Sequence, residues 1–396
     1  MSSVGLHAAR RIYPARRRLK SAPFPAPRRA SIRTHPVRTR VGVIRMRGPN
    51  DADDRAKLPL GGQRARTVVI AAFVAIAAVL GYAAVRSFPA VPAAALEKLT
   101  IAVPTVPHAA LLFIAAAKGY FAEEGIEAAI LPVTHGRAAL DLLIEGKADF
   151  ASATEVPFVI ALLRGKALAL AASVLSVPTR NAIVARRDRG IAAPGDLAGK
   201  KIGVTPGTNG EYFLWAFMIR HRLAPESVTL VNVPPGDTAR ALASGAVDAT
   251  STWPPIVLEA QSALGANAVV FVQPDAYTET FAVIGRSEFL RTHPAATRAV
   301  VRALLKAERF SQAAPEEALH IVAKRLGVQA QELRPVLETL QPRVDLRQSH
   351  LITMEDEARW AMARGHAASG PVPNFLPHLH LDALLAVQPR RVTVLH

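Results

Sequence analysis

The chain has 396 residues, of which 50% are hydrophobic and 20% are charged. This composition excludes a disordered chain, a coiled coil and a collagen-like repeat, and the length allows two or three domains. The absence of cysteine excludes disulfides, thiolate metal sites, iron–sulfur clusters and a cysteine nucleophile.

The net charge of +17 is concentrated at one end of the sequence. Residues 1–66 contain 17 of the 48 Lys and Arg residues and three of the 31 acidic residues, so the rest of the chain is nearly balanced. Residues 1–66 are also rich in Arg, Pro and Ala without an apolar period, which predicts a disordered leader. Met46 is an alternative start that would shorten this leader. The basic charge therefore gives no indication that the folded body binds nucleic acid.

Residues 67–85 form an apolar stretch of 19 residues without a charge. The stretch is long enough to cross a bilayer as a helix, and Arg64 and Arg66 before it predict a cytoplasmic N-terminus and an exported body. We interpret it either as an uncleaved anchor in the inner membrane or as a signal that is cleaved near the small residues Ala93–Ala95. Both interpretations predict a periplasmic or extracellular protein.

After a linker at 86–97, short apolar runs alternate with helical segments. Strands are expected at 99–103, 126–133 and 148–154, and helices at 109–121, 136–146 and from 155 to about 164. Two more apolar runs follow before residue 187. The alternation predicts an α/β fold with a mainly parallel sheet covered by helices.

The same alternation then restarts, which predicts a second lobe. Strands are expected at 201–206, 228–233 and 247–253, each followed by a helix, and the chain becomes mostly helical from Pro294 onward, with helices near 295–312, 315–326 and 354–367. We predict one lobe from residues 98–180 and 279–396, a second lobe from 181–278, and a ligand cleft between them.

Five segments in register resemble one protein family. They are KGYFAEEGIEAAI (Lys118–Ile130), ALDLLIEGKADFASATEVP (Ala139–Pro157), DLAGKKIGVTPGT (Asp196–Thr208), VTLVNVPPGDTARALASGAVDATSTWPP (Val228–Pro255) and QPRRVTV (Gln388–Val394). Over about residues 98–396 the chain resembles the substrate-binding proteins of ABC importers of the nitrate/sulfonate/taurine type.

The resemblance implies a two-lobed periplasmic-binding-protein type II fold that closes on its ligand by a hinge. It also implies a monomer that captures a small anionic solute, such as a sulfonate, nitrate or a related organic acid, and delivers it to an ABC permease in the inner membrane. Catalytic residues, cofactors, metals and nucleic acid are not expected. Pro254 replaces an acid that is frequent in the family's Trp-Glu-Pro motif, so the identity of the solute does not carry over.

Candidate ligand contacts lie where strands end and helices begin, because ligands of open α/β sheets bind there. Gly207 is expected to let the backbone approach the ligand, Thr208 to cap the following helix, and Trp253 to cover the apolar part of the ligand. The predicted binding residues are His108, Ala109, Thr134, His135, Ser152, Thr154, Thr205, Gly207, Thr208, Asn209, Thr252, Trp253 and Tyr277.

Two alternative functions stay open at this point. One is an enzyme on the same fold, similar to a pyrimidine synthase, and the other is a membrane-tethered ligand sensor. The export segment argues against the enzyme, and the sequence has no G-x-S-x-G, H-E-x-x-H or Walker motif.

Overall fold

The computed structural model of the protein describes residues 74, 76 and 95–395. The predicted leader 1–66 lies outside this range, as do most of the linker 86–97 and all of the predicted apolar helix 67–85 except Val74 and Ile76. Within the described part of the chain, no helix has both the length and the apolar character that a membrane crossing needs. Residues 95–395 belong to one compact unit of the chain.

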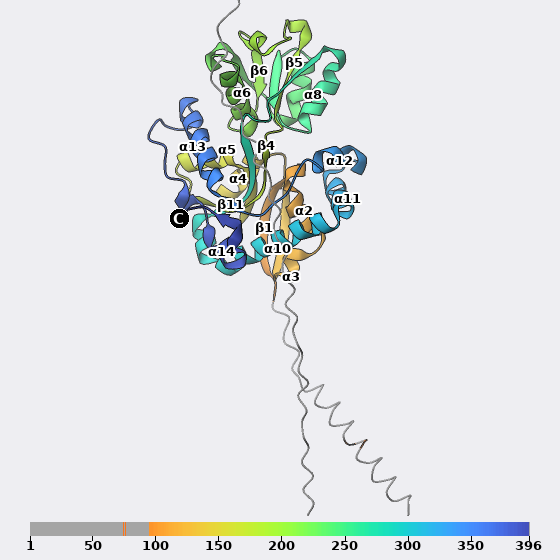
Figure 1. Cartoon of the computed structure of the whole chain (residues 1–396), viewed down its shortest axis with the longest axis vertical. Coiled ribbons are helices and arrows are strands. Elements are labelled where there is room, and N and C mark those ends of the chain that lie inside the picture. The colour runs from red at the N-terminus through yellow and green to blue at the C-terminus, as the bar shows by residue number, and fades with distance from the viewer. Residues whose placement is uncertain (1–73, 75, 77–94, 396) are drawn as a thin grey trace, which may run out of the picture. The chain divides into compact units, whose positions relative to one another are not determined.

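Two five-stranded sheets form the two lobes of this unit (Figure 1). The sheet of lobe I has the order β2-β1-β3-β10-β4, and the sheet of lobe II has the order β7-β6-β8-β5-β9. The strands of lobe I are β1 (Glu97–Pro104), β2 (Ile126–Val133), β3 (Phe150–Thr154), β4 (Leu168–Pro178) and β10 (Thr278–Arg286). Those of lobe II are β5 (Ala182–Arg186), β6 (Lys201–Val204), β7 (Thr229–Asn232), β8 (Ala249–Thr252) and β9 (Ala268–Val272). The central strands β3 and β8 are buried along their whole length, as expected for sheets covered on both faces.

The sheets are mixed, whereas the sequence pattern predicted mainly parallel ones. β10 is antiparallel to β3 and β4, and β5 is antiparallel to β8 and β9. The other pairs, β1 with β2 and β3 and β6 with β7 and β8, are parallel. β5 and β10 are the first strands reached after the chain crosses between lobes. They run antiparallel to their neighbours because the crossing chain enters each sheet at the edge where the carboxyl ends of the parallel strands lie.

Two chain segments cross between the lobes side by side. β4 leads through residues 179–181 into β5, and β9 leads through residues 273–277 into β10. The Thr179 N–H donates a hydrogen bond to the Tyr277 carbonyl at 3.2 Å, so the crossings are paired. Lobe II is therefore one continuous insert between β4 and β10, which are neighbouring strands of lobe I.

Helices cover both sheets. Those of lobe I are α2 (Ala110–Ala117), α3 (Tyr120–Glu123), α4 (Gly136–Ile144), α5 (Glu155–Leu163), α9 (Ser287–Thr292), α10 (Pro294–Ala313), α11 (Pro315–Leu326), α12 (Ala330–Leu337), α13 (Gln348–Ala363) and α14 (Leu381–Val387). Those of lobe II are α6 (Asn209–Arg220), α7 (Thr238–Ala243) and α8 (Ile256–Leu264). The short strands β11 (Leu346–Arg347) and β12 (Val392–Thr393) pair with each other.

The predicted helix 109–121 is divided in the structure. Gly119 has φ 72°, a left-handed conformation that interrupts the helix between α2 and α3. The predicted helix 354–367 also differs, because α13 begins at Gln348 and ends at Ala363. Neither β9 nor β10 was predicted from the sequence.

One large apolar core fills lobe I, and two smaller clusters pack around the sheet of lobe II. A fourth cluster joins the lobes beside the crossings. In it Val156 and Ile160 of α5 meet Tyr212 of α6 and Trp360 of α13. The lobes are therefore held together by side chains as well as by the two crossing segments.

Candidate functional site

A narrow, partly open cavity with a volume of about 20 Å³ lies between the two lobes. Lobe I contributes the end of β1, the short 3-10 helix Pro107–Ala109, the starts of α4 and α5, and part of β10. Lobe II contributes the start of α6 and the residue after β8. The lining residues are Pro104, Val106, His108, His135, Gly136, Arg137, Thr154, Pro157, Thr208, Asn209, Trp253, Glu279 and Phe281.

Three helices begin at this cavity. His135 precedes α4, Thr154 precedes α5 and Thr208 precedes α6, and all three residues line the cavity. The first N–H groups of a helix have no acceptor within the helix, and the N-terminal end of the helix dipole is positive. The cavity is therefore surrounded by main-chain donors from both lobes, an arrangement that favours a negatively charged group.

Thr208 does not cap α6 with its side chain, contrary to the sequence expectation. Its hydroxyl instead donates to the carbonyl oxygen of Thr205 at 2.7 Å. The N–H groups of Glu211 and Tyr212 both bond to the Thr208 carbonyl. The N–H group of Gly207 donates to the Glu211 carboxylate at 2.7 Å, so the N–H groups of Asn209 and Gly210 in the first turn of α6 keep the role of donors toward a ligand.

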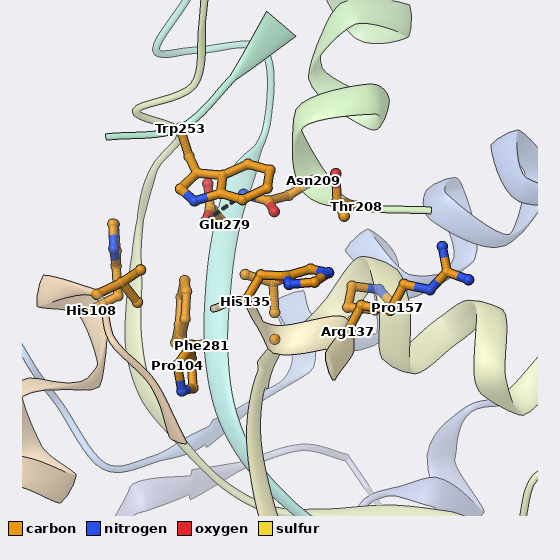
Figure 2. Close-up of a pocket in the computed structure, with 13 residues that line it drawn as sticks. Pro104, His108, His135, Arg137, Pro157, Thr208, Asn209, Trp253, Glu279 and Phe281 are labelled. Atoms are coloured by element: carbon orange, nitrogen blue, oxygen red, sulfur yellow. Dashed lines mark hydrogen bonds between the residues drawn. The ribbon is translucent and has the colours of Figure 1, made fainter. Parts of the chain in front are cut away.

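Aromatic rings form one part of the lining. His108 stacks on Phe281, with ring centroids 4.8 Å apart and an interplanar angle of 12°. Trp253, which is 8% exposed, lies across the cavity above Asn209 and Glu279 (Figure 2). These flat apolar faces are suited to the carbon part of a ligand.

The two histidines of the cavity are neutral near pH 7. Burial, together with the charge of Arg180, lowers the pKa of His108 to about 4. Burial and then the charge of Arg137 lower the pKa of His135 below its ordinary value. His135 also lies in hydrogen-bond contact with the Thr134 hydroxyl, 2.8 Å from its Nδ1 atom. Neither imidazole supplies a positive charge to the cavity at that pH.

Arg137, the arginine of the cavity lining, makes its hydrogen bond outside the cavity. The Arg137 guanidinium points away from Trp253 (Figure 2) and donates to the carbonyl oxygen of Pro206 at 2.7 Å. This hydrogen bond connects lobe I to lobe II. A second connection is the contact between Glu211 of α6 and His366, whose Oε2 and Nε2 atoms are 2.9 Å apart. The two lobes thus touch along one side of the cavity.

Glu279 places a buried carboxyl group in the cavity. Its Oε1 atom accepts a hydrogen bond from the Asn209 side chain at 2.9 Å (Figure 2). Thr179 and Tyr277 donate longer bonds to its Oε2 atom, 3.3 and 3.4 Å. Burial raises the pKa of Glu279 to about 7. The group therefore titrates in the physiological range.

Six of the predicted binding residues line the cavity: His108, His135, Thr154, Thr208, Asn209 and Trp253. Thr134 lies next to it, in an open groove that shares Val106 and Trp253. Gly207 lies in a different groove, beside Arg137 and His366.

The other five predicted residues do not line the cavity. Ala109, Ser152 and Thr252 are buried in the lobes. Thr205 donates its hydroxyl hydrogen to the Val233 carbonyl, and the Tyr277 hydroxyl contacts Asn181 and Asn209 at the crossings.

Seven lining residues are absent from the list of predicted binding residues: Pro104, Val106, Gly136, Arg137, Pro157, Glu279 and Phe281. Val106, Gly136, Arg137 and Glu279 lie one or two positions from a predicted residue, so widening each predicted segment by two positions would have included them. Glu279 and Phe281 lie in β10, for which the sequence pattern gave no signal.

A two-lobed α/β unit with mixed sheets, two paired crossings and a cavity between the lobes defines a periplasmic-binding-protein fold. Residues 106–318, more than half of the chain, match the family described as NMT1/THI5 like, and the chain belongs to this family. The predicted resemblance is confirmed.

Relatives with curated names are binding proteins. A protein of Brucella abortus (strain 2308), provisionally named a binding protein, is 30% identical over 227 residues, which are 54% of this chain and 67% of the relative. A protein of Bacillus subtilis (strain 168), provisionally named an aliphatic sulfonates-binding protein, is 25% identical over 62% of this chain and 75% of its own length.

Solved structures confirm the fold. The periplasmic aliphatic sulphonate binding protein SsuA from Escherichia coli superposes with a TM-score of 0.61 at 16% identity. The match covers 72% of this chain and 98% of the SsuA chain. At this identity the similarity establishes the shared two-lobed architecture.

Proposed function

We propose that the protein is an extracytoplasmic solute-binding protein of an ABC importer, which captures a small organic anion between its lobes and delivers it to a membrane permease. The observation that carries this proposal is the convergence of three helix N-termini, from both lobes, on one cavity. Main-chain donors there suit a sulfonate or a similar anion, and Trp253 and Phe281 suit the carbon chain attached to it.

The names of the relatives support binding rather than catalysis. The Brucella and Bacillus proteins are both named as binding proteins, and the Bacillus name specifies aliphatic sulfonates. We therefore place sulfonates first among candidate solutes, followed by nitrate and other organic acids. A pyrimidine, the ligand class that the enzyme alternative would use, is the competing candidate.

Location and assembly complete the proposal. The SsuA structure is that of a periplasmic protein, and we propose the same compartment for this chain, with the segment 67–85 acting as an anchor or as a removable signal. A monomer in contact with a permease of the inner membrane is the expected working form. Nucleic acid is not an expected partner, because the basic charge lies in residues 1–66.

A thermal-shift screen tests the proposal. The full chain, kept in a nonionic detergent, is heated with alkanesulfonates, nitrate, carboxylates and pyrimidines. Buffers such as HEPES and MES are avoided because they are themselves sulfonates. A solute at 100 times its dissociation constant stabilises the folded state by about 2.7 kcal/mol, which gives a clear shift. Stabilisation by a pyrimidine and by no anion would contradict the proposed solute class.

A further inference from the structure

The cavity combines donors that favour an anion with an acidic group that opposes one. The starts of α4, α5 and α6 surround it, yet Glu279 is 2% exposed and lies among the same lining residues. An ionised Glu279 would stand beside a bound anion in a site with little water, where repulsion between like charges is strong. A protonated Glu279 would instead offer an O–H donor.

We propose that Glu279 carries a proton whenever the cavity holds an anion, so that capture of one anion is accompanied by uptake of one proton. This inference rests on the proposed function, since it assumes that the solute is an anion. It adds that the solute enters the cleft as an electrically neutral pair of anion and proton.

The hydrogen bonds of Glu279 fit this role. The Asn209 amide holds Oε1 at 2.9 Å, whereas the contacts of Oε2 with the hydroxyls of Thr179 and Tyr277 are longer, 3.3 and 3.4 Å. Hydroxyl groups can turn to accept as well as donate, so a proton on the carboxyl group is accommodated without a change of neighbours. Asn209 belongs to lobe II and Glu279 to the returning strand β10, so the proton sits where the lobes meet.

The charges around Glu279 come from several elements. Two further buried acids lie nearby, Glu155 at the start of α5 and Glu357 in α13, and both influence or are influenced by the charge of Glu279. Arg180 in the crossing is exposed, and Arg137 is held by the Pro206 carbonyl. The remaining titratable groups are His108, His135 and Tyr277. Among the described residues neither arginine forms an ion pair with Glu279, and burial raises the pKa of Glu279.

Calorimetry with ethanesulfonate tests the proposal on the full chain in nonionic detergent. Ethanesulfonate keeps its charge at all pH values used, so any dependence on pH comes from the protein. Titrations at each pH in two amine buffers that both buffer at that pH and differ in ionisation enthalpy report the number of protons taken up. At pH 8 we expect close to one proton per ethanesulfonate, and at pH 6 close to none, because Glu279 is then already protonated. The affinity should fall about tenfold per pH unit above about pH 7.

Variants assign the proton. Glu279→Gln, which keeps the shape and has no titrating group, should bind ethanesulfonate with an affinity that changes less than about twofold between pH 6 and 8. Glu259→Gln, an exposed acid of α8, should keep the full dependence of the wild type. Proton uptake that persists in Glu279→Gln and disappears in His135→Gln would overturn the proposal and assign the proton to His135.

The wild-type protein tests the proposal even if Glu279→Gln does not fold. Binding at pH 8 without proton uptake would overturn the inference and leave the proposed function intact. An affinity that rises with pH would overturn it too, because that sign indicates a ligand that donates to an ionised Glu279. Failure of ethanesulfonate, nitrate and carboxylates to bind at any pH from 6 to 8 would reject the proposed function and this inference together.

Discussion

Replacing Glu357 by methionine should stabilise the protein. Glu357 lies in α13 and is fully buried, and no N–H or hydroxyl group among the described residues reaches its carboxyl oxygens with hydrogen-bond geometry. It lies against the carboxyl group of Glu155, to which it can donate a hydrogen bond only when it is protonated. Burial, followed by the charges of Glu155 and Glu279, raises the pKa of Glu357 well above its ordinary value. Methionine has a similar length, and Trp360 and Ala361 of the interlobe cluster lie one turn further along the same face of α13.

The gain should depend on pH. A carboxyl group whose pKa is higher in the folded state than in the unfolded state favours folding fully only below its unfolded pKa, and this contribution is lost as the pH rises toward the folded pKa. For Glu279, with a pKa of about 7 against 4.5, the loss amounts to about 3 kcal/mol at roughly 1.4 kcal/mol per pKa unit. The loss for Glu357 has the same sign.

Two buried histidines change the free energy of unfolding with pH in the opposite direction, but only below about pH 6.5. Burial lowers the pKa values of His108 and His350 to about 4 from 6.5. Their neutral forms favour folding above pH 6.5, and this contribution is lost as the pH falls toward 4. Above pH 6.5 the carboxyl groups act alone, so the free energy of unfolding of the wild type should fall between pH 6.5 and 8.

Chemical denaturation at pH 5.5 and pH 8 measures both effects. We expect Glu357→Met to raise the free energy of unfolding at pH 8 by about 1–3 kcal/mol, the scale of an unsatisfied buried polar group. The gain should be smaller at pH 5.5, where a protonated Glu357 can donate a hydrogen bond to Glu155. The control is Glu355→Met in the same helix, where the side chain is 46% exposed and the change should stay within about 0.5 kcal/mol. A Glu357→Met protein no more stable than the control at pH 8 would refute the reasoning.

Three further changes probe the cavity. Trp253→Ala should weaken solute binding by about 1–3 kcal/mol in calorimetry, and an unchanged affinity would mean that the ring serves packing alone. Gly136→Ala should lower the melting temperature and the affinity for the solute, because a Cβ atom there would lie 2.9 Å from the Cα of Ala153. Gly195→Ala is the control: a Cβ atom at that position meets open space, so neither quantity should change. Gly207→Val should lower the free energy of unfolding by about 1–2 kcal/mol, since φ is 69° at this position. X-ray scattering should show that the wild type contracts when solute binds and that the variant does not. Contraction of the variant would show that the turn at Gly207 is not needed for closure of the lobes.

The sequence predicted the cavity residues that follow parallel strands. Thr154 and Thr208 lie where a strand gives way to a helix, and apolar runs followed by polar turns are visible in the sequence alone. The rule that ligands bind at the carboxyl ends of strands then brings these turns together. The same rule selected Ser152, which lies before the end of β3, and Thr252, which is the last residue of β8, but both are buried in the sheets.

The rule that ligands bind at the carboxyl ends of strands could not identify Glu279 and Phe281, and the reason is physical. They lie in the first half of β10, which enters lobe I from the cleft and runs antiparallel to its neighbours. The amino end of this strand, rather than its carboxyl end, therefore faces the ligand. Only the pairing of β10 with β3 and β4 shows this direction, and strand pairing is a long-range property that periodicity does not report.

The insertion of lobe II between β4 and β10 has a consequence for synthesis on the ribosome. Every strand of lobe II lies between residues 182 and 272, so the lobe is complete as soon as this stretch has emerged. The sheet of lobe I must wait for β10, and its covering helices continue to α14. Lobe II, which begins second in the chain, can thus fold first, while β1 to β4 wait for β10, the strand that separates β3 from β4 in the finished sheet.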